Sequence, residues 1–61
     1  MKSKKNEIYN FIKERGQTTP VEISKALGIS YPTVLKWIKI LELEGKIRTK
    51  KIVGRFIEPI S

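Results

Sequence analysis

The sequence predicts a small, mainly helical α+β domain with three helices, a short extended segment and a C-terminal two-stranded β-hairpin. Apolar residues recur at helical spacing in three stretches, the first two of which end at Gly16 and Gly28. The letters TTP and SYP, which are typical of helix starts, precede the second and third stretches. After Gly45 the apolar residues alternate with polar ones, as they do in strands. We expect residues 1–61 to form a single domain.

The composition excludes several classes of function. The chain has 61 residues with no cysteine and no histidine. Such a short chain buries only a thin core. Without cysteine or histidine it has no disulfide, no thiolate or imidazole metal site and no histidine-based catalytic triad. Its six acidic residues are scattered among lysines, as on a solvated helix surface. We therefore expect no enzyme activity, no cofactor and no metal.

The charge is the first positive indication of a partner. Thirteen lysines and arginines against six acidic residues give a net charge of +7. Residues 46–55 contain no acid, and their basic members are Lys46, Arg48, Lys50, Lys51 and Arg55. A cluster of this kind favours a polyanion, either nucleic acid or an anionic membrane surface.

The sequence contains no membrane-spanning run of about 18 apolar residues and no signal peptide. We therefore expect a cytoplasmic protein. The abundance of lysine and isoleucine is typical of an AT-rich genome and also fits a thermophilic source.

The first helix is expected over about residues 3–15. Ile8, Phe11 and Ile12 fall at i, i+3 and i+4, so they share one helix face. Gly16 supplies the stop, because glycine readily adopts the left-handed conformation that follows a helix. Residues 17–19 are expected to be extended.

The second helix is expected over about residues 20–27. Thr19 is the predicted N-cap, Pro20 suits the first helical position, and Glu22 stands three residues after the cap to complete a capping box. Gly28 ends this helix.

The third helix is expected over about residues 31–44. Ser30 is its predicted N-cap, and Pro32 is tolerated only in the first turn. At the helical period one face forms an apolar stripe, and the opposite face carries lysines. The stripe consists of Val34, Ile38 and Leu41, with Gly45 beyond it; the opposite face holds Pro32, Leu35, Lys36, Lys39 and Leu43.

The C-terminal stretch, over about residues 46–58, is expected to form a hairpin with basic strands. Gly54 lies between its two short runs, and Pro59 ends the second. The alternative interpretation of these charges is a basic edge strand that discourages aggregation.

The stretch TTPVEISKALGISYPTVLKWIKILELEGKIR resembles the winged helix-turn-helix domain of prokaryotic and archaeal transcription regulators, such as the MarR-like, ArsR-like and Lrp-like families. The resemblance is carried by the capped start at Thr19, apolar Ile23 and Leu27, and the glycine turn before the third helix. It covers about residues 7–56. The chain departs from the family pattern at Lys46, where the family has an apolar residue.

This resemblance implies a double-stranded DNA-binding protein, a small transcriptional regulator. Its third helix would read the major groove, and its basic wing would follow phosphates or the minor groove. The recognition-helix contacts it implies are Tyr31, Thr33, Leu35, Lys36 and Lys39; those of the wing are Arg48, Lys50, Lys51 and Arg55. Thr19 and Ser30 are first of all helix caps, and a phosphate contact from either would be additional.

Each of these residues also has a plainer interpretation. Leu35 is equally a stray exposed leucine or a partner contact, and Lys36 and Lys39 would belong to a solvated face. Tyr31 would be a surface cap over the turn. Trp37 is expected at the edge of the core rather than stacked on a base.

Three further expectations concern partners. A homodimer on a palindromic site would use exposed apolar residues, and the candidates are Leu43, Ile52, Val53, Ile57 and Ile60. The alternative functions are a non-specific architectural DNA-binding protein and a protein-interaction winged-helix module. As a DNA-binding protein it would be associated with the nucleoid.

Overall fold

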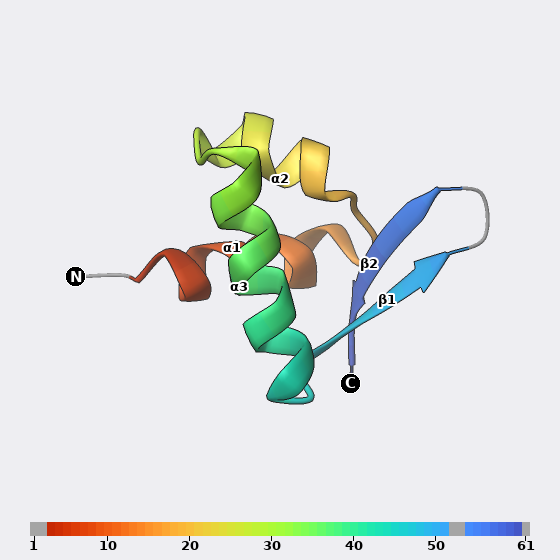
Figure 1. The fold of residues 1–61 in the computed structure, drawn as a ribbon. Coiled ribbons are helices and arrows are strands. Elements are labelled where there is room, and N and C mark those ends of the chain that lie inside the picture. The colour runs from red at the N-terminus through yellow and green to blue at the C-terminus, as the bar shows by residue number, and fades with distance from the viewer. Residues whose placement is uncertain (1–2, 52–53, 61) are drawn as a thin grey trace.

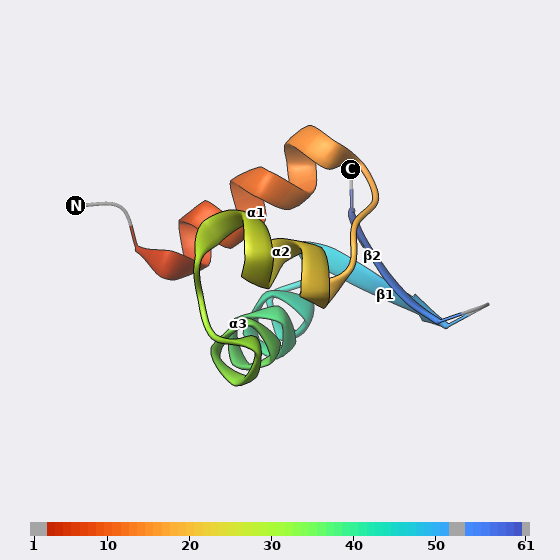
Figure 2. The ribbon, with the colours of Figure 1, turned by 90° about the horizontal axis from the view of Figure 1, so that it is seen from above.

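The computed structural model describes residues 3–51 and 54–60 of the chain. Its elements are α1 (Lys4–Arg15), α2 (Pro20–Leu27), α3 (Tyr31–Leu43), β1 (Ile47–Lys51) and β2 (Arg55–Pro59). The three helices cross one another, and the antiparallel hairpin extends from one side of them (Figures 1 and 2). This confirms the predicted order of three helices followed by a two-stranded hairpin.

The capping residues of α1 and α2 favour a helix start or a helix end at the positions where the structure has them. Gly16 has a φ of +77° after α1, and its N–H donates to the carbonyl of Ile12. At the start of α2, Thr19 Oγ1 accepts a hydrogen bond from the N–H of Glu22 (3.2 Å), which confirms the predicted N-cap. The Glu22 carboxylate was expected to complete a capping box, but it accepts a hydrogen bond from Thr18 Oγ1 (2.9 Å). Thr18 is only 2% exposed, so this bond satisfies a buried hydroxyl.

The turn into α3 confirms the predicted N-cap position but not a capping hydrogen bond from the Ser30 side chain. Ser30 occupies the N-cap position of α3, but its side chain makes no capping hydrogen bond. Its hydroxyl donates instead to Thr33 Oγ1 (2.8 Å). A hydrogen bond from α2 stabilises the turn, because Ser24 Oγ donates to the carbonyl of Ile29 (2.6 Å). Ser30 therefore marks the start of α3 without capping it through its hydroxyl.

The core joins all five elements. Val34, Ile38 and Leu41 are buried along one side of α3, which confirms the predicted stripe. The other members of the buried cluster are Ile8, Ile12, Ile23, Ile29, Ile47 and Ile57. Trp37 is half-buried against this cluster, as expected for a residue at the edge of the core. A core built from branched aliphatic side chains fixes α3 and the hairpin relative to each other.

The hairpin is also joined to the chain ahead of α2 through the backbone. The N–H of Thr18 donates to the carbonyl of Ile57 (2.9 Å), and the N–H of Ile57 donates back to Thr18 (2.7 Å). The segment expected to be extended therefore forms a bridge to β2. Ile57, named above as a candidate dimer residue, is fully buried. That prediction is wrong, because the strand register turns the Ile57 side chain into the protein's own core.

The other dimer candidates differ in position. Leu43, at the end of α3, is 80% exposed, and Ile60, after β2, is 40% exposed. Ile52 and Val53 lie outside the described residues.

Candidate nucleic-acid interface

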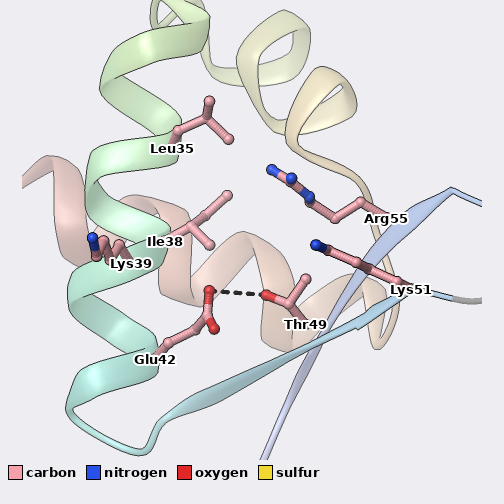
Figure 3. Close-up of a pocket in the computed structure, with 7 residues that line it drawn as sticks. All are labelled: Leu35, Ile38, Lys39, Glu42, Thr49, Lys51 and Arg55. Atoms are coloured by element: carbon pink, nitrogen blue, oxygen red, sulfur yellow. Dashed lines mark hydrogen bonds between the residues drawn. The ribbon is translucent and has the colours of Figure 1, made fainter.

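A groove lies between α3 and the hairpin (Figure 3). It has a volume of about 790 Å³ and is open to solvent. Its lining residues are Leu35, Ile38, Lys39, Glu42, Thr49, Lys51 and Arg55. The groove thus combines an apolar wall with three cations, one carboxylate and one hydroxyl.

The two walls of the groove follow from the periods of their elements. On α3, Leu35, Lys39 and Glu42 stand at i, i+4 and i+7, so they lie along one side of the helix. On the hairpin, alternate residues share a face, and residues paired across the strands share it too. Lys51 is paired with Arg55, so both side chains extend from the same face toward α3 (Figure 3).

Four of the predicted site residues therefore come together. Leu35 and Lys39 from the helix face Lys51 and Arg55 from the hairpin across the groove. Leu35 is half-buried beside Ile38, so it belongs to the groove wall rather than being an isolated exposed leucine.

Two of the predicted hairpin residues lie on the other face. Arg48 and Lys50 alternate with the groove-lining residues of β1, and their cross-strand partners are Glu58 and Phe56 respectively. Lys50 Nζ also forms an ion pair with Glu58 Oε1 (3.2 Å). The basic residues of the hairpin thus divide between two faces, and a carboxylate partly neutralises the outer one.

The remaining predicted residues of α3 do not line the groove. Tyr31 is 43% exposed at the first position of the helix. Thr33 is half-buried and bonded to Ser30. Lys36 is exposed, and its ammonium lies 5.1 Å from the centre of the Trp37 ring. These residues extend the α3 surface beyond the groove, toward the start of the helix and its outer side.

Thr19 lies outside the groove as well. It stands at the N-cap of α2, where its hydroxyl accepts the hydrogen bond from Glu22.

Sequence reasoning missed two residues of the groove. Thr49 Oγ1 donates a hydrogen bond to Glu42 Oε1 (2.9 Å), which joins β1 to α3 (Figure 3). Glu42 had a signal in the sequence, since it stands three residues after Lys39 on the same side of the helix. Thr49 likewise stands two residues before Lys51 on β1, so the two side chains share one face of the strand.

A further carboxylate, that of Glu44 just after α3, lies in a separate cluster. Glu44 Oε2 is 2.8 Å from Lys5 Nζ, and Glu44 Oε1 is 3.7 Å from Lys46 Nζ. The hydrogen bond from Lys5, helped by the charges of both lysines, holds the pKa of Glu44 below its ordinary value. Within residues 3–51 and 54–60, no ion pair includes the three groove cations. These cations are therefore available to an external anion.

A second hollow, of about 470 Å³, lies between α1 and α2 and has the opposite character. Glu7 and Glu14 line it together with a single cation, Lys13. Of the two hollows, the groove beside α3 is the one whose charges suit a polyanion. Within the part of the chain that the structure describes, no group of three potential metal ligands occurs.

Comparison with known families decides the kind of polyanion. Residues 1–48 match the family described as winged helix-turn-helix DNA-binding. The chain belongs to this family. No curated protein and no solved structure matches it significantly. The matched region includes all three helices and the first residues of β1. The rest of β1 and all of β2 lie beyond it; these two strands form the wing of the winged helix.

Membership of the family identifies the winged helix as a DNA-binding domain. Binding of this kind fits transcription regulation, and the family does not favour an architectural or protein-interaction role over it. Over the described residues, no helix has the length and apolar character needed to cross a membrane.

Proposed function

We propose that the winged helix regulates transcription by placing α3 in the major groove of a promoter site, with the wing along the adjacent backbone. The observation that carries this proposal is the groove in which Lys39 of α3 faces Lys51 and Arg55 of the wing. Three cations that form no ion pair among the described residues lie along one concave surface and match the charge of a phosphate backbone. The protein acts by occupying DNA, without catalysis and within the nucleoid.

The start of α3 supplies the base contacts in this proposal. The major groove admits an α-helix, and the N-terminal residues of a recognition helix reach base edges. Tyr31 and Lys36 are exposed on this helix, and Thr33 is half-buried near its start. Leu35 offers an apolar surface of the kind that contacts a thymine methyl group.

The wing supplies backbone contacts. Lys51 and Arg55 reach toward α3 and would meet the phosphates that flank the groove read by the helix. Arg48 and Lys50 contribute diffuse attraction from the outer face, because Lys50 is paired with Glu58. The hydroxyls of Thr19 and Ser30 already take part in internal hydrogen bonds, so any phosphate contact they make is secondary.

Two copies of the protein would bind one palindromic site in this proposal, because a single winged helix covers a limited length of DNA. Of the candidate dimer residues that the structure describes, Leu43 and Ile60 are exposed and would make this contact. Light scattering coupled to size exclusion, with and without a palindromic duplex, measures the stoichiometry. A single copy per palindrome would contradict this part of the proposal.

Binding-site selection from random duplex DNA at about 0.15 M salt tests the regulator proposal, because the phosphate contribution is moderate there. We expect a recovered motif. We also expect Leu35→Ala to lose base preference at one position of that motif. Its far-UV circular dichroism and its cooperative melting should remain those of a folded protein. Tight binding without any enriched sequence would overturn the proposal in favour of architectural binding.

A further inference from the structure

Glu42 places a negative charge inside the groove that the proposed function assigns to DNA. Its side chain lines the groove with the three cations, and its carboxylate accepts the hydrogen bond from Thr49 (2.9 Å). Glu42 is exposed, and no ion pair among the described residues includes it. The protein's other carboxylates near the hairpin, Glu44 and Glu58, are each paired with lysine.

A carboxylate that forms no ion pair among the described residues opposes the cations around it. A DNA backbone that follows Lys39, Lys51 and Arg55 brings phosphates near Glu42, and like charges at separations of several ångströms repel even in a solvated groove. The repulsion fades only over a Debye length, about 8 Å at physiological salt. The carboxylate therefore offsets part of the attraction that the cations produce.

Thr49 determines the position of the Glu42 carboxylate through its hydrogen bond. Its hydroxyl stands on β1, on the groove-lining face, and the bond draws the carboxylate of α3 toward the wing (Figure 3). A carboxylate without this donor would be free to extend from α3 toward the bound backbone. The hydrogen bond thus keeps the charge in the groove while limiting its approach to a ligand.

We propose that Glu42 limits the affinity of the winged helix for DNA backbone, and that Thr49 positions its carboxylate. This inference rests on the proposed function, because it requires DNA in the α3–wing groove. Its consequence is weaker retention on DNA that offers phosphates alone, so that base contacts from α3 contribute a larger share of stable binding.

A different role for Glu42 would be direct reading of cytosine, whose amino group donates to carboxylates. The structure favours the affinity-limiting role for two reasons. Glu42 stands in the last turn of α3 (Tyr31–Leu43), whereas base-reading residues lie near the start of a recognition helix. One of its carboxylate oxygens also already accepts a hydrogen bond from Thr49.

The test measures binding of a mixed-sequence duplex by fluorescence anisotropy between about 0.05 and 0.2 M salt, where phosphate contacts dominate the salt response. Glu42→Gln removes the charge and keeps an oxygen that can accept from Thr49. Glu14→Gln is the matched control: it raises the net charge by the same one unit, from +7 to +8, but lies in the hollow between α1 and α2.

We expect Glu42→Gln to tighten binding on the order of three- to tenfold at the low-salt end, from the loss of one like charge at short range. The slope of log K against log salt should steepen by up to about 0.9, as if one more phosphate were neutralised. Glu14→Gln should change the affinity less than about twofold, because Glu14 lines the hollow between α1 and α2 and not the groove, so salt screens its charge more from the bound DNA.

Thr49→Val provides the second arm and tests the positioning role. In the wild-type background we expect it to weaken binding, because the released carboxylate moves toward the phosphates. In the Glu42→Gln background it should have little effect, because no charge is left to position. Equal effects of Thr49→Val in the two backgrounds would overturn the positioning role.

Two further variants separate failure of this inference from failure of the proposed function. If Lys39→Gln and Arg55→Gln weaken binding but Glu42→Gln leaves it unchanged or weaker, the inference is wrong and the interface stands. If none of the three changes the affinity, the interface itself is wrong. A loss of affinity in Glu42→Gln confined to one base position would assign base reading to Glu42 and would also overturn the inference.

Discussion

Thr18 and Ile57 are joined by two backbone hydrogen bonds, of 2.9 and 2.7 Å, which fasten the wing to the segment that leads into α2. The Ile57 side chain is fully buried in the shared core. One residue of the wing is therefore held both by its backbone and by its side chain. The groove between α3 and the wing depends on this attachment, because it fixes the strand that carries Arg55.

Replacing Ile57 by alanine should destabilise the protein strongly. Truncating a buried isoleucine to alanine costs about 2–5 kcal/mol. A domain of 61 residues has a total stability of roughly 3–9 kcal/mol. Urea unfolding followed by circular dichroism measures the loss, and we expect Ile57→Ala to lose a large part of the wild-type free energy of unfolding.

Ile60→Ala is the matched control for this change, because Ile60 directly follows β2 and is 40% exposed. We expect it to alter the free energy of unfolding by less than about 1 kcal/mol. If the two variants were equally stable, Ile57 would not occupy the core of the protein in solution.

The sequence predicted the structure best where the spacing of the apolar residues fits only one face of a helix. The spacing of Val34, Ile38 and Leu41 by four and three residues allows only one helix face, and that face is buried. The start of α2 was equally predictable, because Thr19 suits the N-cap and Pro20 suits the first helical position.

The hairpin was less predictable. Alternation along a strand shows which side chains share a face, but it does not show which of the two faces is buried. What covers the inner face is the rest of the core, and Ile57 on that face is also bridged to Thr18, far earlier in the chain. For that reason the burial of Ile57, and which of Lys50 and Lys51 faces α3, could not be read from the sequence. The Glu42–Thr49 bond depends on the same choice of face.

The two predicted helix caps should differ in energetic value. Thr19→Ala removes the acceptor for the Glu22 N–H and should lower the free energy of unfolding by about 1 kcal/mol. Ser30→Ala should cost less than about 0.5 kcal/mol, because the hydroxyl makes no capping bond and serves only Thr33 at the surface. Urea unfolding of both variants checks this. A larger loss in Ser30→Ala would contradict the hydrogen bonding at the start of α3.

Acid should weaken the contact between α1 and the end of α3. The pKa of Glu44 is lowered in the folded protein, chiefly by the hydrogen bond from Lys5. The ionised Glu44 carboxylate therefore stabilises the folded protein fully above the ordinary carboxyl pKa. This stabilisation is lost as the pH falls through the lowered pKa of Glu44 in the folded state. We expect Glu44→Gln to melt lower than wild type at pH 7 in low salt, and the difference to shrink toward pH 3. A constant difference across this range would contradict the assignment.

The division of the wing into two faces predicts different roles for two neighbouring lysines. Lys51→Gln should weaken binding to duplex DNA and reduce the salt slope by about 0.9, the value for one phosphate contact. Lys50→Gln should have a smaller effect, because Lys50 lies on the outer face and is paired with Glu58. Anisotropy titrations across salt concentrations measure both. An equal or larger effect of Lys50→Gln would mean that the outer face of the wing meets DNA.

The most direct test of the proposed interface is a titration of the ¹⁵N-labelled protein with a selected duplex, followed through its backbone amide signals. If DNA occupies the α3–wing groove, the largest shifts should occur at Tyr31, Leu35, Lys39, Lys51 and Arg55. Glu7, Glu14 and Leu27, which line the hollow between α1 and α2, should shift little. Large shifts in that hollow, with α3 and the wing unchanged, would contradict the account.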